Sequence, residues 1–208
     1  RTGKIELARI GQTRRDVVTF EEIPPIVIDA QTAVEDKTFW DNTGFDPLAI
    51  ISAGLDSFRG RSRGASTITQ QLVRQRLLEE DLVQDPKRTA ERKLKEIIQS
   101  IRLTKAFPGE EGKQQIMAAY LNNNYYGNQS YGVKAAAASY FGKALADLTP
   151  GEAATLAALP QSPSNYDLVR NAVTTCDEPE DAEGNCPEPN KNEHLILEPD
   201  TKIAQRRD

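Results

Sequence analysis

Two acidic positions have residue types suited to proton transfer. Glu35 and Asp36 are adjacent and are followed by the apolar Phe39 and Trp40. Apolar surroundings raise the pKa of a carboxyl group towards the range in which it works as a general base. Glu96 is a second carboxylate, with an arginine four residues before it. Taken alone, each residue is as easily a surface acid, because i,i+4 ion pairs are ordinary on helices and structural ion pairs also perturb pKa values.

A second group of side chains is suited to binding an anion such as a diphosphate. Such a ligand needs several hydrogen-bond donors together with neutralising cations. At 100° per residue, Thr67, Gln70, Gln71 and Arg74 fall within an arc of about 100° on a helix. The candidates are Ser66, Thr67, Gln70, Gln71 and Arg74 in one segment and Arg92 and Lys93 in another. Together with the carboxylates, these polar and basic residues fit three interpretations: glycosidic chemistry, phosphate-ester binding or a charged helical surface. Their spacing alone does not distinguish among the three.

The elements that must position these residues are mostly helical. Apolar periodicity predicts helices over residues 27–39, 48–58, 67–78, 88–105, 110–122, 133–141 and from 150 to just before 160. Asp46 and Pro47 are a typical helix start, and Thr149 with Glu152 predicts a capping box. Strands are expected only at residues 4–10 and 17–20. The glycine- and arginine-rich residues 60–64 predict a loop.

The helix over residues 88–105 has two distinct predicted faces. Its core-facing side is expected to contain Leu94, Ile97, Ile98, Ile101 and Leu103. Its charged side is expected to contain Arg88, Arg92 and Glu96, which recur every four residues.

Length and charge limit the class of protein. The 208 residues are enough for one medium-sized domain, and 38% hydrophobic with 27% charged residues is typical of a globular chain. A net charge of −5 argues against a nucleic-acid partner, although basic residues concentrate between Arg59 and Lys105. The sequence contains no apolar run of about 18 residues, so we expect any membrane anchor to lie outside it.

The C-terminal part of the chain has an acidic segment flanked by its two cysteines, Cys176 and Cys186. Two cysteines in an otherwise cysteine-free chain favour a disulfide and an oxidising, extracytoplasmic setting. A zinc site is less favoured, because His194 is the only histidine. We expect residues 170–195 to form a polar loop insertion and residues 196–207 to begin a helix.

Five strings in one order identify a family. Residues 35–48 (EDKTFWDNTGFDPL), 64–75 (GASTITQQLVRQ), 91–96 (ERKLKE), 116–122 with Gly127 (IMAAYLN) and 148–163 (LTPGEAATLAALPQSP) resemble its five motifs. The family is the peptidoglycan glycosyltransferases, family 51 of the glycosyltransferases, found as a domain of class A penicillin-binding proteins. The second string is the most specific, and together they cover about residues 23–166.

The resemblance implies an all-α, lysozyme-like fold with a larger helical lobe and a small membrane-facing jaw lobe at about residues 44–64. The glycosyltransferase domain would then occupy residues 23–169, after a lead-in of residues 1–22. Residues 170–195 would be the acidic loop, and residues 196–208 the start of a helix or linker, with a penicillin-binding transpeptidase domain expected to follow.

The resemblance also implies the reaction, which is polymerisation of lipid II into glycan strands by inverting β-1,4 transfer from a lipid-diphosphate donor. Glu35 would be the base that deprotonates the acceptor sugar, and Glu96 the second catalytic carboxylate. The residues that it implies contact substrate are Asp36, Ser66, Thr67, Gln70, Gln71, Arg74, Arg92, Lys93 and Asn122. No cofactor is required, although Glu96 could hold Mg²⁺ or Mn²⁺ against the diphosphate.

The implied partners are lipid II, the growing glycan on undecaprenyl diphosphate, the extracytoplasmic face of the bacterial membrane, other cell wall synthesis proteins and inhibitors of the moenomycin type. The sequence departs from the family pattern at Asn42, where histidine is usual, and at Arg74 and Gln75, where Lys-Asn is usual. A lytic enzyme of similar fold and an inactive lipid II-binding scaffold are the alternatives, and the diphosphate-binding residues and the two glutamates argue against them.

Overall fold

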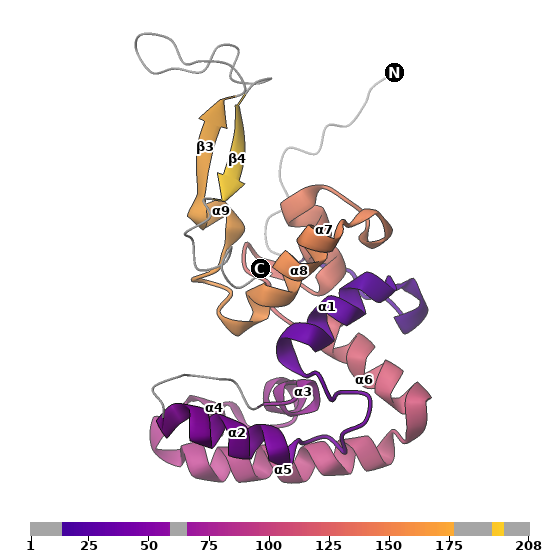
Figure 1. Ribbon diagram of the computed structural model, residues 1–208, viewed down its shortest axis with the longest axis vertical. Coiled ribbons are helices and arrows are strands. Elements are labelled where there is room, and N and C mark those ends of the chain that lie inside the picture. Colours follow the sequence, from indigo (N-terminus) through magenta and orange to yellow (C-terminus); the bar gives the residue numbers. More distant parts are fainter. Residues whose placement is uncertain (1–13, 59–65, 177–192, 198–208) are drawn as a thin grey trace.

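The chain is described as a computed structural model over residues 14–58, 66–176 and 193–197 (Figure 1). Within these ranges the helices are α1 (Pro25–Glu35), α2 (Pro47–Phe58), α3 (Ile68–Arg76), α4 (Glu80–Gln84), α5 (Thr89–Ala106), α6 (Gly109–Asn123), α7 (Val133–Phe141), α8 (Pro150–Ala158) and α9 (Leu168–Asn171). Short 3-10 turns are η1 (Phe20–Glu22), η2 (Pro86–Arg88), η3 (Leu145–Asp147) and η4 (Leu159–Gln161). The predicted all-α, lysozyme-like class is confirmed.

The helices form two groups joined by α6. In Figure 1 the helices α2, α3, α4 and α5 lie at one end of the molecule, and α1, α7 and α8 form the body above them. The helix α6 runs from the first group into the second and presents four fully or nearly buried side chains to the core, namely Ile116, Met117, Tyr120 and Leu121. Burying one such side chain is worth about 1.5–3 kcal/mol. The core therefore centres on α6 and the helices around it.

Helix starts follow the local sequence closely. The Asp46 carboxylate accepts hydrogen bonds from the backbone N–H groups of Leu48 (2.9 Å) and Ala49 (3.0 Å) at the start of α2. Thr149 caps α8 in a capping box with Glu152, and Gly142 ends α7 with a left-handed φ of 63°. These predicted boundaries are confirmed.

Helix α1 is shorter than predicted, because it ends at Glu35 instead of Phe39. The carboxylate of Asp36 accepts a hydrogen bond from the backbone N–H of Ile68, the first residue of α3 (3.0 Å). That bond draws the chain away from the helical path and into the loop of residues 36–46.

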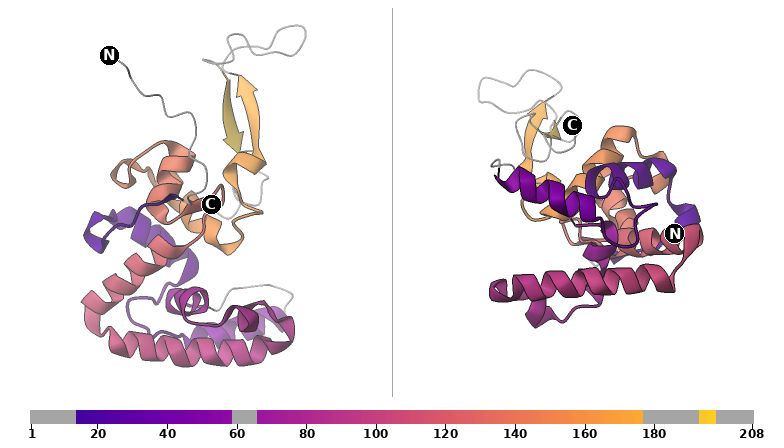
Figure 2. Two further views of the ribbon diagram at one scale, coloured as in Figure 1. Left: turned by 180° about the vertical axis from the view of Figure 1, so that it is seen from behind. Right: turned by 60° about the horizontal axis from the view of Figure 1, so that its bottom comes forward.

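Strand predictions were wrong at two places. Residues 17–20 are not a strand; the chain there is irregular and enters η1, and Val18 is held by the Asn122 side chain. The segment expected to be a loop contains β3 (Ala172–Cys176), which pairs antiparallel with β4 (Glu193–Leu197) in a projecting hairpin (Figures 1 and 2). Ile196, expected to begin a helix, pairs with Val173 in this hairpin, because β-branched residues favour a pleated surface. A second small sheet pairs β1 (Arg14–Arg15) with β2 (Ser130–Tyr131) in parallel.

Several predictions fall on residues without a described structure. These are the strand at 4–10, the loop at 60–64 and the C-terminal helix beyond residue 197. Cys176 is disulfide-bonded, and Cys186, the only other cysteine of the sequence, lies outside the described residues. Among the described helices, none combines the length and apolar character needed to cross a bilayer.

Helix α5 follows its predicted faces only in part, since Leu103 packs against the core as expected and Ile97 and Ile101 are partly buried. Leu94 is 59% exposed and Ile98 is 41% exposed, whereas Glu96 and Ser100 are fully buried. Glu96 faces inward because Arg74 on α3 is its partner. The apolar periodicity therefore identified the helix correctly, but Leu94 and Ile98 were wrongly placed on its buried side.

Candidate active site

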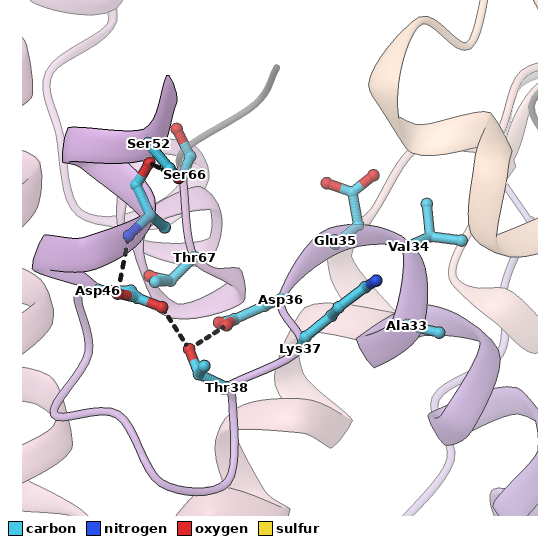
Figure 3. Close-up of a pocket in the computed structure, with 11 residues that line it drawn as sticks. Ala33, Val34, Glu35, Asp36, Lys37, Thr38, Asp46, Ser52, Ser66 and Thr67 are labelled. Carbon is cyan, nitrogen blue, oxygen red and sulfur yellow. Dashed lines mark hydrogen bonds between the residues drawn. The ribbon is translucent and has the colours of Figure 1, made fainter. Parts of the chain in front are cut away.

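The end of α1, the first half of α2 and the two residues before α3 line one pocket. The pocket has a volume of about 190 Å³ and is lined by Ala33, Val34, Glu35, Asp36, Lys37, Thr38, Asp46, Ala49, Ser52, Ser66 and Thr67. Figure 3 shows the carboxylates of Glu35 and Asp36 pointing in different directions from neighbouring backbone positions. The two adjacent acids therefore face different surroundings.

Glu35 is the last residue of α1 and is partly exposed to the pocket. Gln71 on α3 donates a hydrogen bond from Nε2 to the Glu35 carboxylate at 2.7 Å. The same Gln71 side chain accepts one from the Tyr120 hydroxyl at 3.2 Å, and that hydroxyl accepts one from Gln31 at 3.4 Å. This row of hydrogen bonds fixes the direction of the Glu35 carboxylate.

Asp36 is buried, with 7% of its surface exposed. Its carboxylate accepts hydrogen bonds from Asn42 Nδ2 (3.0 and 3.1 Å), from the Thr38 hydroxyl (3.3 Å) and from the Ile68 backbone N–H (3.0 Å). Burial raises the pKa of Asp36, and these hydrogen bonds oppose the rise. Asp36 lines the pocket and also holds the start of α3 through Ile68, and its predicted contact with substrate stays a prediction.

The N-terminus of α3 is built from two of the residues predicted to bind substrate. Thr67 caps the helix in a reciprocal box with Gln70, and both side chains are almost completely buried. The Thr67 hydroxyl also donates to the carbonyl oxygen of Gly44 at 2.8 Å. Thr67 and Gln70 therefore fix where α3 begins, which sets the direction of Gln71 and Arg74 further along it.

A cluster of charges lies between α3 and α5. The Glu96 carboxylate is fully buried and lies 2.6 Å from Arg74 Nε, 3.4 Å from Arg92 Nε and 3.2 Å from Lys93 Nζ. Lys93 also donates to the hydroxyl of Ser66 at 2.6 Å. We call Arg74, Arg92, Lys93 and Glu96 the cation cluster. The structure thus brings together four of the predicted residues, with Ser66 beside them.

The titration of the cation cluster reflects this arrangement. Burial acts to raise the pKa of Glu96, but Arg74 and Lys93 outweigh it and the pKa is lowered. Burial lowers the pKa of Lys93, assisted by the neighbouring arginines, although Glu96 opposes the change. The pKa of Lys93 shifts downward mainly because burial disfavours its charged form, whereas the pKa of Glu96 shifts downward because the neighbouring cations favour its charged form. Glu96 is consequently a structural anion within a surplus of positive charge.

Asn122 does not belong to this site. Its side chain accepts a hydrogen bond from the Val18 backbone N–H (2.9 Å) and donates to the Val18 carbonyl (2.7 Å). Its neighbour Asn124 instead accepts a hydrogen bond from Gln75 (2.9 Å), beside a second cavity of about 430 Å³. Sequence reasoning missed this cavity, for which the only signal was the Asn- and Tyr-rich turn after α6.

Comparison with known proteins decides the family. The model of the transglycosylase family matches residues 3–183. The chain belongs to the transglycosylase family. It is 44% identical to penicillin-binding protein 1A of Aquifex aeolicus over 159 residues, which are 76% of this chain and 20% of that protein. The resemblance stated from the motifs is thereby confirmed.

Two further relatives give the same result. The transglycosylase chain is 42% identical to penicillin-binding protein 1A of Escherichia coli over 162 residues, covering 77% of this chain and 18% of that protein. It is 38% identical to penicillin-binding protein 1A/1B of Bacillus subtilis over 169 residues, covering 80% and 17%. The transglycosylase chain therefore spans about a fifth of the length of these relatives.

Proposed function

We propose that this domain is a peptidoglycan glycosyltransferase that polymerises lipid II in cell wall synthesis. The proposal rests on the relative position of Glu35 and the cation cluster, because side chains of one helix, α3, bind both of them. Gln71 holds Glu35, and Arg74, three residues further along α3, binds Glu96. A base and an excess of positive charge are the two groups that transfer from a diphosphate donor needs.

In the proposed reaction, Glu35 takes the proton of the 4-hydroxyl of the acceptor N-acetylglucosamine. That oxygen forms a bond with C1 of the donor N-acetylmuramic acid, and the bond from C1 to the lipid diphosphate breaks. The diphosphate leaves with the electron pair, and the attack from the opposite side inverts C1 and gives the β-1,4 link. Arg74, Arg92 and Lys93 would stabilise the departing negative charge.

Glu96 does not fit the role of a metal ligand. Its carboxylate is already surrounded by three cations at 2.6–3.4 Å. Among the described residues, no three acidic, histidine or cysteine side chains lie together in a way that could hold an ion. We therefore assign Glu96 to orienting the cations and derive no step through Mg²⁺ or Mn²⁺.

The proposed substrate is attached to a lipid, so the domain should work at the extracytoplasmic membrane surface. Large apolar side chains are exposed on α2 and α5, including Leu48 (75%), Ile51 (61%) and Leu94 (59%). Both helices lie at one end of the molecule (Figure 1). Exposed apolar side chains at one end support contact with a membrane. Cell wall synthesis proteins and moenomycin-type inhibitors are the further proposed partners.

The experiment uses labelled lipid II and the Glu35→Gln variant. The parent should form glycan polymer, and the variant should be slower by about 10²–10⁴-fold, the usual contribution of a general base. Asp29→Asn is the matched control, because Asp29 is an exposed acid on the same helix. Polymerisation by Glu35→Gln at the parental rate contradicts the assignment of the base. Cleavage of preformed glycan by the parent, without polymer, would establish a lytic enzyme.

A further inference from the structure

Lys113 on α6 is a buried cation outside the cation cluster. Only 5% of its surface is exposed, and its ammonium donates to the carbonyl oxygens of Phe39 (2.6 Å) and Asn42 (2.7 Å) and to Asn42 Oδ1 (3.2 Å). It also lies 4.7 Å from the centroid of the Phe39 ring. All three hydrogen-bond acceptors are neutral oxygens in the loop of residues 36–46. Lys113 therefore ties α6 to this loop.

Asn42 carries the connection onward. Its Oδ1 accepts hydrogen bonds from Lys113 and from the backbone N–H of Gly44 (3.0 Å), while its Nδ2 donates to both oxygens of the Asp36 carboxylate. Position 42 thus needs an acceptor on one side and a donor on the other. A carboxamide meets both needs without titrating.

Asp36 and Glu35 bind the same helix at two points. Asp36 accepts from the backbone N–H of Ile68 in the first turn of α3, and Glu35 accepts from Gln71 one turn later. The end of α1 is therefore attached to α3 on both sides of the peptide bond between the two acids. A change in the position of Asp36 must also change the direction of Glu35.

Burying a lysine is costly, because the charged form loses its hydration. Desolvation lowers the pKa of Lys113, and Asp36 and Asp41 oppose that change. An apolar side chain would fill the same space in the core at lower cost. The specific result of placing a lysine here is three hydrogen bonds to the loop that follows Glu35.

We infer that Lys113 is a positioning residue for Glu35, and that it acts through Asn42 and Asp36 to hold the base in its working orientation. We call Lys113, Asn42 and Asp36 the loop clamp. The inference rests on the proposed function, since it takes Glu35 to be the base. It extends that function to a residue with no contact with Glu35 or the cation cluster among its hydrogen bonds.

The first test compares Lys113→Met with Lys143→Met in the lipid II assay. Methionine keeps most of the length of lysine without its charge, and Lys143 is a lysine paired with Glu152 on α8 (2.8 Å), which lies outside the pocket beside Glu35. For Lys113→Met we expect kcat to fall by about 10–100-fold, as for a reacting group displaced by about 1 Å. KM should stay within about threefold, because the cation cluster is unchanged. Lys143→Met should retain the parental kcat.

The second test is independent of activity and uses Trp40, the only tryptophan. Its ring lies 5.0 Å from that of Phe39, whose carbonyl oxygen binds Lys113. Quenching of Trp40 fluorescence by acrylamide should increase in Lys113→Met and remain parental in Lys143→Met. A parent that makes no polymer rejects the proposed function, while Trp40 still reports whether the loop clamp exists.

Asn42→Asp tests the loop clamp if Lys113→Met does not fold. Aspartate keeps the acceptor for Lys113 but replaces the donor to Asp36 with a like charge. We expect a folded protein with lower kcat and more accessible Trp40. A folded Lys113→Met or Asn42→Asp variant with kcat within about twofold of the parent and unchanged quenching overturns the inference.

Discussion

Replacing Glu96 with glutamine removes the single negative charge of the cation cluster and leaves its shape nearly unchanged. Removing one partner of a buried ion pair costs about 3–5 kcal/mol, since the remaining charge is buried without compensation. The partners here keep some contact with water, with 31% of the Arg74 side chain and 33% of the Lys93 side chain exposed. We therefore expect a loss near the lower limit, about 3 kcal/mol.

Thermal unfolding measures this loss. For a domain of this size, 1 kcal/mol lowers Tm by about 2–4 °C, so Glu96→Gln should lower it by about 6–12 °C. Glu91→Gln is the matched control on the same helix. Glu91 pairs with Arg88 (2.9 Å) and Lys95 (3.0 Å), but its side chain is 43% exposed, so its loss should lower Tm much less than the loss of Glu96.

The dependence on pH gives an independent check. The pKa of Glu96 is lowered from its ordinary value of 4.5 by Arg74 and Lys93, against the effect of burial. A carboxylate with a lowered pKa stabilises the folded state above its unfolded-state pKa, and this contribution disappears as pH falls through the folded-state pKa. The difference between parent and Glu96→Gln should thus be constant near neutral pH and shrink below pH 4.5. Equal melting temperatures for Glu96→Gln and Glu91→Gln at pH 7 would refute this account.

Three more changes have defined outcomes. Gly44→Ala should destabilise the fold by about 1–3 kcal/mol, because φ of Gly44 is +96° and the added methyl group would collide with a backbone oxygen of α5. Thermal unfolding measures this loss, and an unchanged Tm would contradict the prediction. Thr149→Ala should cost about 1 kcal/mol through the lost capping box with Glu152, and Thr149→Ser should restore most of it. Gln71→Glu places a second carboxylate beside Glu35, and two like charges this close oppose each other's ionisation. The acid limb of the pH profile of kcat/KM should therefore move to higher pH by about one unit or more. An acid limb at the parental pH would exclude a direct interaction between the two side chains.

Local signals predicted much of the fold correctly. The start of α2 at Pro47, the capping box of α8 and the end of α7 at Gly142 each depend on residues within one turn of the boundary. The predicted disulfide of Cys176 has a different basis, since it required only a count of cysteines. Interactions within a few residues can be inferred from the sequence because the chain itself brings those residues together.

The errors arose where distant segments meet. Glu96 is buried on α5 because it pairs with Arg74, which lies 22 residues earlier in the chain. The Asn122 side chain is hydrogen-bonded to Val18, which lies 104 residues earlier. The contact of Lys113 with Asn42 spans 71 residues. Periodicity along one helix contains no information about such partners. The sequence therefore offered Glu35, Arg74, Lys93 and Glu96 together with Thr67, Gln70 and Asp36, and it did not show that Thr67, Gln70 and Asp36 make the hydrogen bonds that fix the start of α3.

The count of charges in the cation cluster has a consequence for the resting protein. Three cations surround one carboxylate, so the cluster has two positive charges more than its own anion neutralises. Mutual repulsion among these cations is an unfavourable term that a bound polyanion relieves. A ligand that binds only the folded state raises stability by mass action. Inorganic pyrophosphate, which shares the charged group of the proposed donor and lacks its lipid and sugar, should therefore raise Tm, and added neutral salt should weaken that gain.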